Sequence, residues 1–372
     1  MTKVFKCFDT RATVIGLLMT VTVSSCSLGG VAKNKEVMMI SGLSFSPDNT
    51  KLLLNRCVTG EKCALGVYDF ATGRLFEYRF PQNEVWSMAR YSDDGQKIVF
   101  VRTPIKEGLN SIEYERMQIA MMNPDGSDVR TITNHAGPKF NPSFSHSGNK
   151  VIFIQAGRVQ PERGITTAKH DVYEVEVTTG KATQLTYYAF SEISSPLYLP
   201  DDTQFIFSAD YLTAFPGLSE YDAIRQKREE FKANYRENTI FIMGPDNQGL
   251  KPILVHGEHS NEARITRDGK TLRFVSIMKN HPLNEKSKSR YFYEIFERTE
   301  NGDIAMNTLL GMAPIWEFAM SADGSLLAVQ YEAFSGDSFS FNKRNPRQLA
   351  VISTRDNKVN MIAVPAEATP IN

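Results

Sequence analysis

The sequence has no excess of charge of either sign and none of the patterns that bind nucleotides. Its 372 residues include 42 basic and 42 acidic side chains, so it lacks the positive excess that is typical of nucleic-acid-binding proteins. Neither a phosphate-binding loop nor a dinucleotide-binding glycine pattern occurs. We therefore expect no nucleic-acid partner and no cofactor.

No apolar run is long enough to cross a membrane. The apolar stretch 12–23 has twelve residues, whereas a transmembrane helix needs about 20. Three basic side chains precede this stretch, and it ends in Val-Ser-Ser-Cys at 23–26, which is typical of a signal peptide. The position of Cys26 resembles a bacterial lipobox, in which the cysteine is lipidated and becomes the new N-terminus. The alternative is an ordinary signal peptide that is cleaved near Ser25.

The lipobox resemblance sets the expected location. Ser27 follows the cysteine, and by analogy with lipoprotein sorting the absence of aspartate there favours the outer membrane. We expect residues 1–25 to be a signal peptide and residues 26–39 a lipidated tether. The N-terminal lipid then holds the protein in the membrane of the cell envelope, facing the periplasm. Removal of residues 1–25 leaves a net charge of −2.

Only four cysteines occur, and Cys7 and Cys26 are assigned to the signal peptide and the lipid. The remaining pair, Cys57 and Cys63, flanks a short loop. In an exported protein such a pair predicts a disulfide, which stabilises the fold by about 2 kcal/mol by restricting the unfolded chain. Two free thiols are the alternative. A metal site would need further ligands nearby, and none is visible.

What the sequence does contain is one turn pattern repeated six times. Each copy is a Ser/Thr-x-Asp-Gly-like turn followed by an apolar run, as in Ser46-Pro47-Asp48-Asn49 before Leu52-Leu53-Leu54. Asp, Gly and Pro supply the backbone angles that a tight turn needs. The third turn residue of each copy is Asp48, Asp94, Ser147, Asp201, Asp268 or Asp323. These are 46, 53, 54, 67 and 55 residues apart, a spacing that is typical of propeller blades.

A second hairpin follows each copy. In the second copy it is closed by Asn123-Pro124-Asp125-Gly126 between two β-rich runs, which is a hairpin signal. Each copy therefore predicts four strands, A to D. The whole pattern resembles the TolB-like, WD-like propeller repeat. The resemblance implies an all-β, six-bladed β-propeller of four-stranded antiparallel blades over residues 40–365, with a tail at 366–372.

The resemblance says little about function, because this propeller serves binders and enzymes alike. TolB itself has an extra domain before its propeller and is not lipid-anchored. Here fewer than fifteen residues separate Cys26 from the first blade. We therefore do not expect TolB's own role.

The loops between strands B and C point to a binding face. They are expected at 102–116, 156–170, 209–238, 278–290 and 332–347, and long loops in a compact domain are usually functional. With the short first loop, 55–63, they carry a net charge of +6 on a mature chain of −2. We expect this face to bind an anionic protein surface or envelope glycan. Solvated side chains on flexible loops are the alternative. The basic candidates are Arg158, Arg163, Lys286, Lys288 and Arg290.

The longest of these loops, 209–238, predicts a helix. Tyr221 and Phe231 belong to one narrow apolar stripe, and Ser219 with Asp222 resembles a capping box. We expect this helical insert in blade four to contribute to the binding face. A helix that merely docks on the blade edge is equally compatible with the pattern.

Bulky residues recur near both ends of the A strands. Phe45, Tyr91 and their four equivalents are expected to pack between blades rather than to form a binding ring. Trp86 and Trp316 begin A strands near the other end of the channel, and we consider both as ligand contacts.

Catalytic patterns are weak. His256 and His259 lie three residues apart, and with Glu262 they could bind a metal, as in some propeller lyases that the sequence resembles in fold. The alternative reading is ordinary polar loop residues. The interpretation that we adopt is a non-catalytic, lipid-anchored binding protein. The competing interpretation is a metal-dependent lyase or hydrolase that acts on an anionic saccharide at the channel mouth.

Overall fold

The computed structural model shows a ring of six β-sheets, so the predicted six-bladed propeller is confirmed. It describes residues 37–58, 62–106, 111–160, 166–210, 238–244, 249–253, 260–277, 293–299, 302–306, 308, 315–332 and 347–371. Each blade contains four antiparallel strands in sequence order, and blades one and two contain one further strand each.

The strands of blades one to three are as follows. Blade one contains β1 (Val37–Phe45), β2 (Lys51–Val58), β3 (Ala64–Asp69), β4 (Arg74–Tyr78) and, at its outer edge, β26 (Thr369–Ile371). Blade two contains β5 (Glu84–Tyr91), β6 (Ile98–Lys106), β7 (Ser111–Ile112), β8 (Gln118–Met122) and β9 (Arg130–Thr131). Blade three contains β10 (Lys139–Phe144), β11 (Lys150–Gln160), β12 (Thr166–Glu176) and β13 (Ala182–Gln184).

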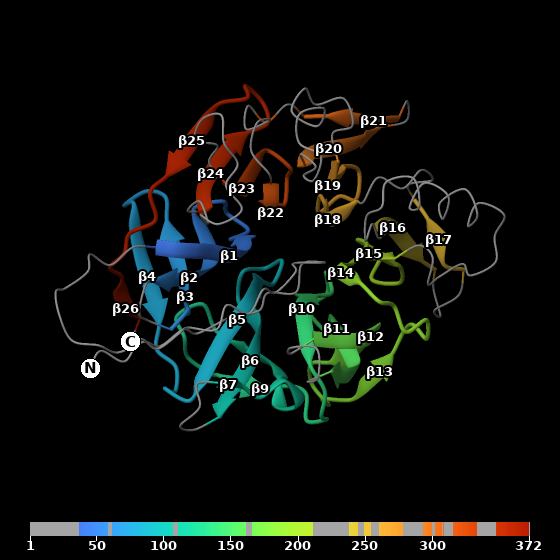
Figure 1. Ribbon diagram of the computed structural model, residues 1–372. Coiled ribbons are helices and arrows are strands. Elements are labelled where there is room, and N and C mark those ends of the chain that lie inside the picture. Colours follow the sequence, from blue (N-terminus) through green and yellow to red (C-terminus); the bar gives the residue numbers. More distant parts are fainter. Residues whose placement is uncertain are drawn as a thin grey trace, which may run out of the picture.

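Blades four to six follow the same order. Blade four contains β14 (Ile193–Tyr198), β15 (Phe205–Asp210), β16 (Asn238–Met243) and β17 (Lys251–Pro252). Blade five contains β18 (Asn261–Ile265), β19 (Leu272–Ile277), β20 (Tyr293–Thr299) and β21 (Gly302–Ala305). Blade six contains β22 (Ile315–Met320), β23 (Leu326–Glu332), β24 (Arg347–Ser353) and β25 (Val359–Ile362). The first strand of each blade lies nearest the central axis (Figure 1).

The repeated turns form because the aspartate side chain accepts hydrogen bonds from groups of its own turn. In blade one, Asp48 accepts hydrogen bonds from the Ser46 hydroxyl (2.5 Å) and the Thr50 amide (3.1 Å). Asn49 then takes a positive φ of 60°, the left-handed conformation that asparagine and glycine adopt most readily. The hydrogen bonds lower the pKa of the Asp48 carboxyl, and the equivalent aspartates of four other blades show the same direction.

Every innermost strand contains a register shift that the sequence analysis did not predict. In five blades the residue three positions before the end of the strand has a positive φ, at Gly42, Met88, Asn141, Ser195 and Glu262. At Gly42 a side chain would also collide with Asn55, because an added Cβ would lie 2.8 Å from its Oδ1 atom. Such bulges bend a strand and re-aim its side chains. Here they change which residues face the channel.

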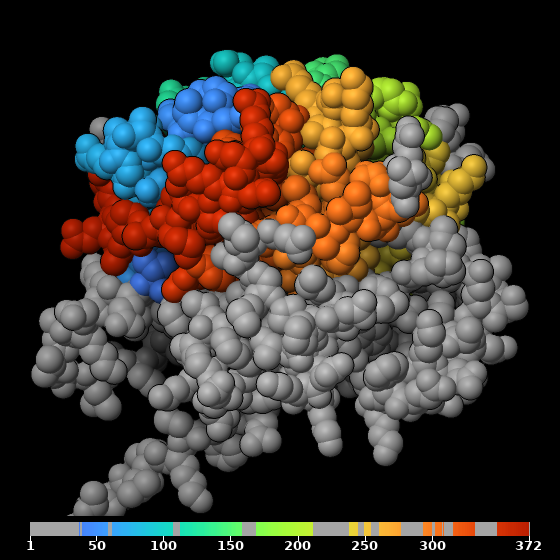
Figure 2. Space-filling model, turned by 90° about the horizontal axis from the view of Figure 1, so that it is seen from above, coloured from blue at the N-terminus to red at the C-terminus, as the bar shows by residue number. Residues whose placement is uncertain are grey.

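The ring closes where the first and last blades meet, shown as blue beside red in Figure 2. Glu317 in β22 accepts hydrogen bonds from the backbone amides of Gly42 (3.0 Å) and Leu43 (2.8 Å) in β1. At the outer edge, β26 pairs in parallel with β4. These C-terminal residues were predicted to be a tail after the propeller, whereas in the structure they form the fifth strand of blade one.

Two predicted loops differ from expectation. Most of the range 156–170 belongs to a long hairpin, because β11 and β12 stay paired as far as Gln160 and Thr166. The ends of the range 209–238 belong to strands β15 and β16. The helix predicted between them lies outside the described residues. The only helical segment of the described residues is the 3₁₀ turn Tyr114–Arg116 in blade two, so the helical insert in blade four is not supported.

The predicted disulfide between Cys57 and Cys63 is present. It closes the loop between β2 and β3, and both cysteines are buried. Within the residues that the structure describes, no helix is both long and apolar enough to span a membrane.

Candidate functional site at the channel mouth

A cavity of about 150 Å³ lies at the axis, at the ends of the innermost strands. All six blades contribute to its lining, through the last residues of each A strand and the first residues of the turn that follows. This places the cavity on the face of the short A–B turns. We call it the channel mouth. It is opposite the end at which the B–C loops begin.

Aromatic and aliphatic side chains form much of the wall of the channel mouth. The six residues that were expected only to pack between blades all contribute to it: Phe45, Tyr91, Phe144, Tyr198, Ile265 and Met320. Phe45, Phe144 and Tyr198 are also buried, so these residues pack between blades and line the cavity at once.

A buried ion pair lies in the wall of blade five. Arg264 donates to Glu262 Oε2 (2.8 Å) and to the Ser195 hydroxyl of blade four (3.0 Å), which itself donates to Glu262 Oε2 (3.0 Å). Both charged side chains are 7% exposed. Because each charge is satisfied by the other, this pair is a structural link between two blades.

Arg90 of β5 differs from Arg264 in having no such partner. Its side chain lines the channel mouth, and none of the hydrogen bonds or ion pairs of the described residues involves its guanidinium. Glu262 and Glu317 act on it only through space. Burial and the nearby Arg264 lower the pKa of Arg90 to about 9, so the group remains charged at neutral pH. An unpaired guanidinium beside a cavity favours an anion, above all a carboxylate.

Glu317 does not neutralise Arg90 directly, because its two oxygens are held by the amides of blade one. Burial and the nearby Glu262 raise the pKa of the Glu317 carboxyl.

A second set of charges spans the rim of the channel mouth. Asp93, in the turn of blade two, lies 2.7 Å from Nδ1 of His146 in blade three and 3.3 Å from Nε of Arg267 in blade five. Blades two and five stand opposite each other in a ring of six, so the Asp93–Arg267 contact crosses the mouth. The hydrogen bond to Asp93 raises the pKa of His146.

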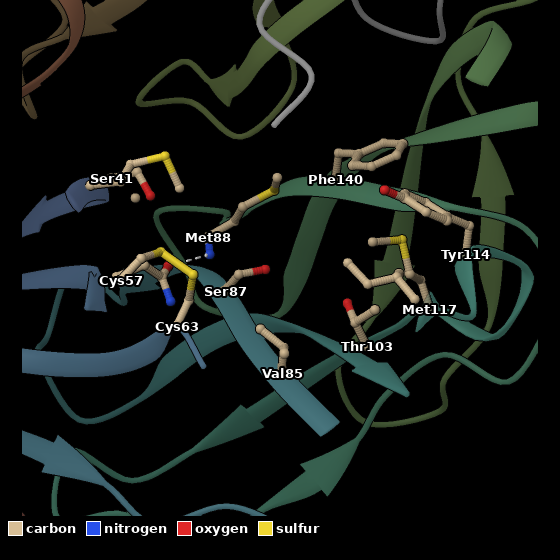
Figure 3. A pocket seen from close by; sticks show the side chains of 14 residues that line it. Ser41, Cys57, Cys63, Val85, Ser87, Met88, Thr103, Tyr114, Met117 and Phe140 are labelled. Atoms are coloured by element: carbon tan, nitrogen blue, oxygen red, sulfur yellow. Dashed lines mark hydrogen bonds between the residues drawn. A yellow bond between two sulfur atoms is a disulfide. The ribbon is translucent and has the colours of Figure 1, made fainter. Parts of the chain in front are cut away.

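A smaller apolar cavity, of about 40 Å³, lies between blades one to three toward the other end of the innermost strands. Figure 3 shows the Cys57–Cys63 disulfide, Met88, Met117 and Phe140 around it. A cavity of this size holds at most one or two water molecules, so it offers no room for a partner.

The structure places only some of the residues that were predicted as contacts. Trp86 is 4% exposed, donates its indole N–H to Glu84 (3.0 Å) and packs on Phe80 and Phe100. It therefore belongs to the core and not to an open surface. Trp316 is half-buried near the start of β22, and Arg158 lies in β11, paired with Ala168. The other predicted residues lie outside the described residues: Cys26, Arg163, Tyr221, Phe231, His256, His259, Lys286, Lys288 and Arg290.

The metal hypothesis stays a prediction, because His256 and His259 lie outside the described residues. Oε2 of the third predicted ligand, Glu262, accepts hydrogen bonds from Arg264 and Ser195. Among the residues that the structure describes, no three histidine, cysteine or carboxylate side chains gather as metal ligands would.

Sequence reasoning missed Arg90, Asp93, His146 and Arg267. A signal for three of them exists in the aligned turns. The second turn position is Pro47, Pro200 or Ala322 in three blades, but it is Asp93, His146 and Arg267 in the others. Charged residues at a position that the repeat does not require are the mark of a site.

Comparison with known proteins supports the fold. No family model matches the chain, and no curated protein matches it either. Among solved structures it is similar to an oligogalacturonate lyase in complex with manganese, with 14% identity and a TM-score of 0.51, covering 86% of this chain and 76% of that one. It is also similar to an oligogalacturonate lyase from Vibrio parahaemolyticus, with 15% identity and a TM-score of 0.52, covering 86% and 76%.

A third similar structure is TolB from Acinetobacter baumannii, with 15% identity and a TM-score of 0.50. The likeness covers 86% of this chain and 62% of that one, so the chain spans less than two thirds of that protein. Identities this low carry information about the fold and not about activity. The chain is a six-bladed β-propeller with a fold similar to that of TolB and of the two lyases.

Proposed function

We propose that this protein is a non-catalytic binding protein of the cell envelope that holds an acidic group of a partner at the channel mouth. The observation that carries the proposal is the unpaired guanidinium of Arg90 beside a cavity at the axis. A carboxylate bound there would form charge-assisted hydrogen bonds, which are about twice as strong as neutral ones.

The expected location follows from the N-terminal residues. Lipidation of Cys26 would hold the propeller at the outer membrane, facing the periplasm, where an acidic protein surface or an anionic glycan can reach it. Mass spectrometry of the mature protein is expected to find a lipid on an N-terminal Cys26. An unmodified N-terminus at any other residue would refute the anchor without affecting the proposal for the channel mouth.

The long-loop face remains a second proposed contact surface. Its basic residues Lys286, Lys288 and Arg290 were predicted to attract the same kind of anionic partner. A partner large enough to cover one face of the ring cannot touch both faces, so the two surfaces make separable predictions.

Replacing Arg90 by glutamine is expected to weaken binding of an acidic probe at least about tenfold, which corresponds to about 1.4 kcal/mol. The probe is a fluorescent decapeptide of alternating glutamate and leucine, and its glutamine counterpart shows the background. Fluorescence anisotropy with the mature protein gives both affinities. Because the contact is between charges, added salt should weaken it.

The matched control is Arg298→Gln. Arg298 lies on the outer part of blade five, where it pairs with Asp303 at 3.1 Å, and this change removes the same charge without touching the mouth. Unchanged binding in Arg90→Gln, or equal loss in both variants, would refute the proposal. Turnover of oligogalacturonate with added manganese, seen as an unsaturated product, would favour the competing lyase interpretation.

A further inference from the structure

The rim of the channel mouth already holds a carboxylate of the protein itself. Asp93 bridges His146 on the neighbouring blade and Arg267 on the opposite blade. Each of these side chains is at the edge of the cavity that Arg90 lines. A carboxylate therefore fits between the basic side chains of the rim, and the protein supplies one from a turn.

The part of the bridge that crosses the mouth, between Asp93 and Arg267, is a weak contact. The side chains of Asp93, His146 and Arg267 are 32%, 21% and 56% exposed. Ion pairs this open to water contribute little to stability, and 3.3 Å between Asp93 and Arg267 is longer than a strong charge-assisted hydrogen bond. Another carboxylate can thus replace Asp93 at Arg267 at small cost. The buried Arg264–Glu262 pair below it cannot be exchanged in this way.

The backbone around the bridge is fixed independently of Asp93. The amides of His146 and Ser147 donate to Asp202 of blade four at 2.6 and 2.8 Å. The amide of Arg267 donates to the carbonyl of Ala322 in blade six at 2.8 Å. The turns that present His146 and Arg267 therefore stay in place when the Asp93 side chain leaves.

We infer that Asp93 is a tethered occupant of a carboxylate-binding site, and that a ligand carboxylate enters the channel mouth by displacing it from Arg267 and pairing with Arg90. This inference rests on the proposed function and names the ligand group: one carboxylate, carried by an acidic residue of a polypeptide.

Two features favour a polypeptide over a sugar acid. A cavity of about 150 Å³ has room for a group about as large as benzene, which is one acidic side chain with its neighbouring methylenes. The wall includes Phe45, Leu197, Ile265 and Met320, which suit an aliphatic arm. Serine hydroxyls also line the cavity, so competition by galacturonate tests this choice.

If a ligand carboxylate displaces Asp93, substitutions at Asp93 and at Arg90 should change the binding affinity in opposite directions. When a side chain of the protein occupies a site, a ligand can bind only during the fraction of time that the site is open. The apparent affinity is lowered by that fraction. Asp93→Asn removes the charge of the occupant and keeps its size, so we expect the glutamate decapeptide to bind several-fold more tightly. Arg90→Gln is expected to weaken the same binding, and the double variant should lose the gain.

The experiment measures the four affinities at about 0.15 M salt, where charges more than about 8 Å apart are largely screened. Asp125→Asn is the matched control, because Asp125 lies in an exposed C–D turn of the same face, where its carboxylate binds only Ser127 of its own turn. It should change nothing. Thermal unfolding checks that each variant is folded, and Asp93→Ser replaces Asp93→Asn if the latter does not fold.

The outcomes separate the two proposals. If Arg90→Gln weakens binding but neither Asp93 variant tightens it, the exchange is overturned and the proposed function stands. If Arg90→Gln has no effect, the proposed function itself fails. Galacturonate that competes with the decapeptide and responds to the same substitutions would overturn the assignment to a polypeptide.

Discussion

Replacing Arg264 by methionine is expected to lower the free energy of unfolding by about 3–5 kcal/mol, the usual cost of leaving one partner of a buried ion pair alone. The change leaves the Glu262 carboxylate buried without the guanidinium that binds it at 2.8 Å. It also removes the hydrogen bond to Ser195, which joins blade five to blade four. Denaturant unfolding at neutral pH measures the loss.

The double variant Glu262→Gln with Arg264→Met provides the control. It removes the stranded charge as well, so it should recover a large part of the loss, because replacing both members of a buried pair is often tolerated. A loss of stability below about 1 kcal/mol in the single variant would match an exposed pair instead. It would contradict the role of the pair as a structural link between the two blades.

Replacing Glu317 by alanine is expected to cost about 3 kcal/mol, because each buried amide that loses its acceptor costs about 1–3 kcal/mol. Here the two amides are those of Gly42 and Leu43. These two hydrogen bonds join the last blade to the first. The loss should appear in denaturant unfolding as a lower midpoint with an unchanged slope if the ring still unfolds as one unit.

The neutral variant Glu317→Gln separates hydrogen bonding from charge. Its remaining oxygen can accept from one amide, so we expect about half of the loss. The control is Glu113→Gln, which breaks only a surface pair with Arg116 and should shift stability by no more than about 0.5 kcal/mol. Equal losses in Glu317→Ala and Glu113→Gln would show that ring closure does not depend on Glu317.

The repeat made the fold predictable. Each copy contains its own turn signal, as in Ser92, Asp94 and Gly95. The hydrogen bonds that these residues form in the turn join residues only a few positions apart. Local signals of this kind can be read from one sequence. The disulfide was predictable for the same reason, because Cys57 and Cys63 are close in the chain.

Contacts between distant residues were not predictable in this way. Whether Thr369–Ile371 forms a strand depends on the edge of β4, almost 300 residues earlier. The bulges in the innermost strands leave no turn signal, since Met88, Asn141 and Glu262 take positive φ in the middle of strands. The contact of Asp93 with Arg267 depends on which blades face each other across the ring. The candidate site consists of such contacts, and for this reason the sequence pointed to the other face.

The central claim is that an acidic group binds at Arg90, and a crystal structure of the protein with the glutamate decapeptide tests it most directly. We predict one peptide carboxylate within hydrogen-bond distance of the Arg90 guanidinium, with the Asp93 side chain withdrawn from Arg267. A peptide bound instead across the long-loop face at Lys286, Lys288 and Arg290, with Arg90 and Asp93 unchanged, would contradict the account.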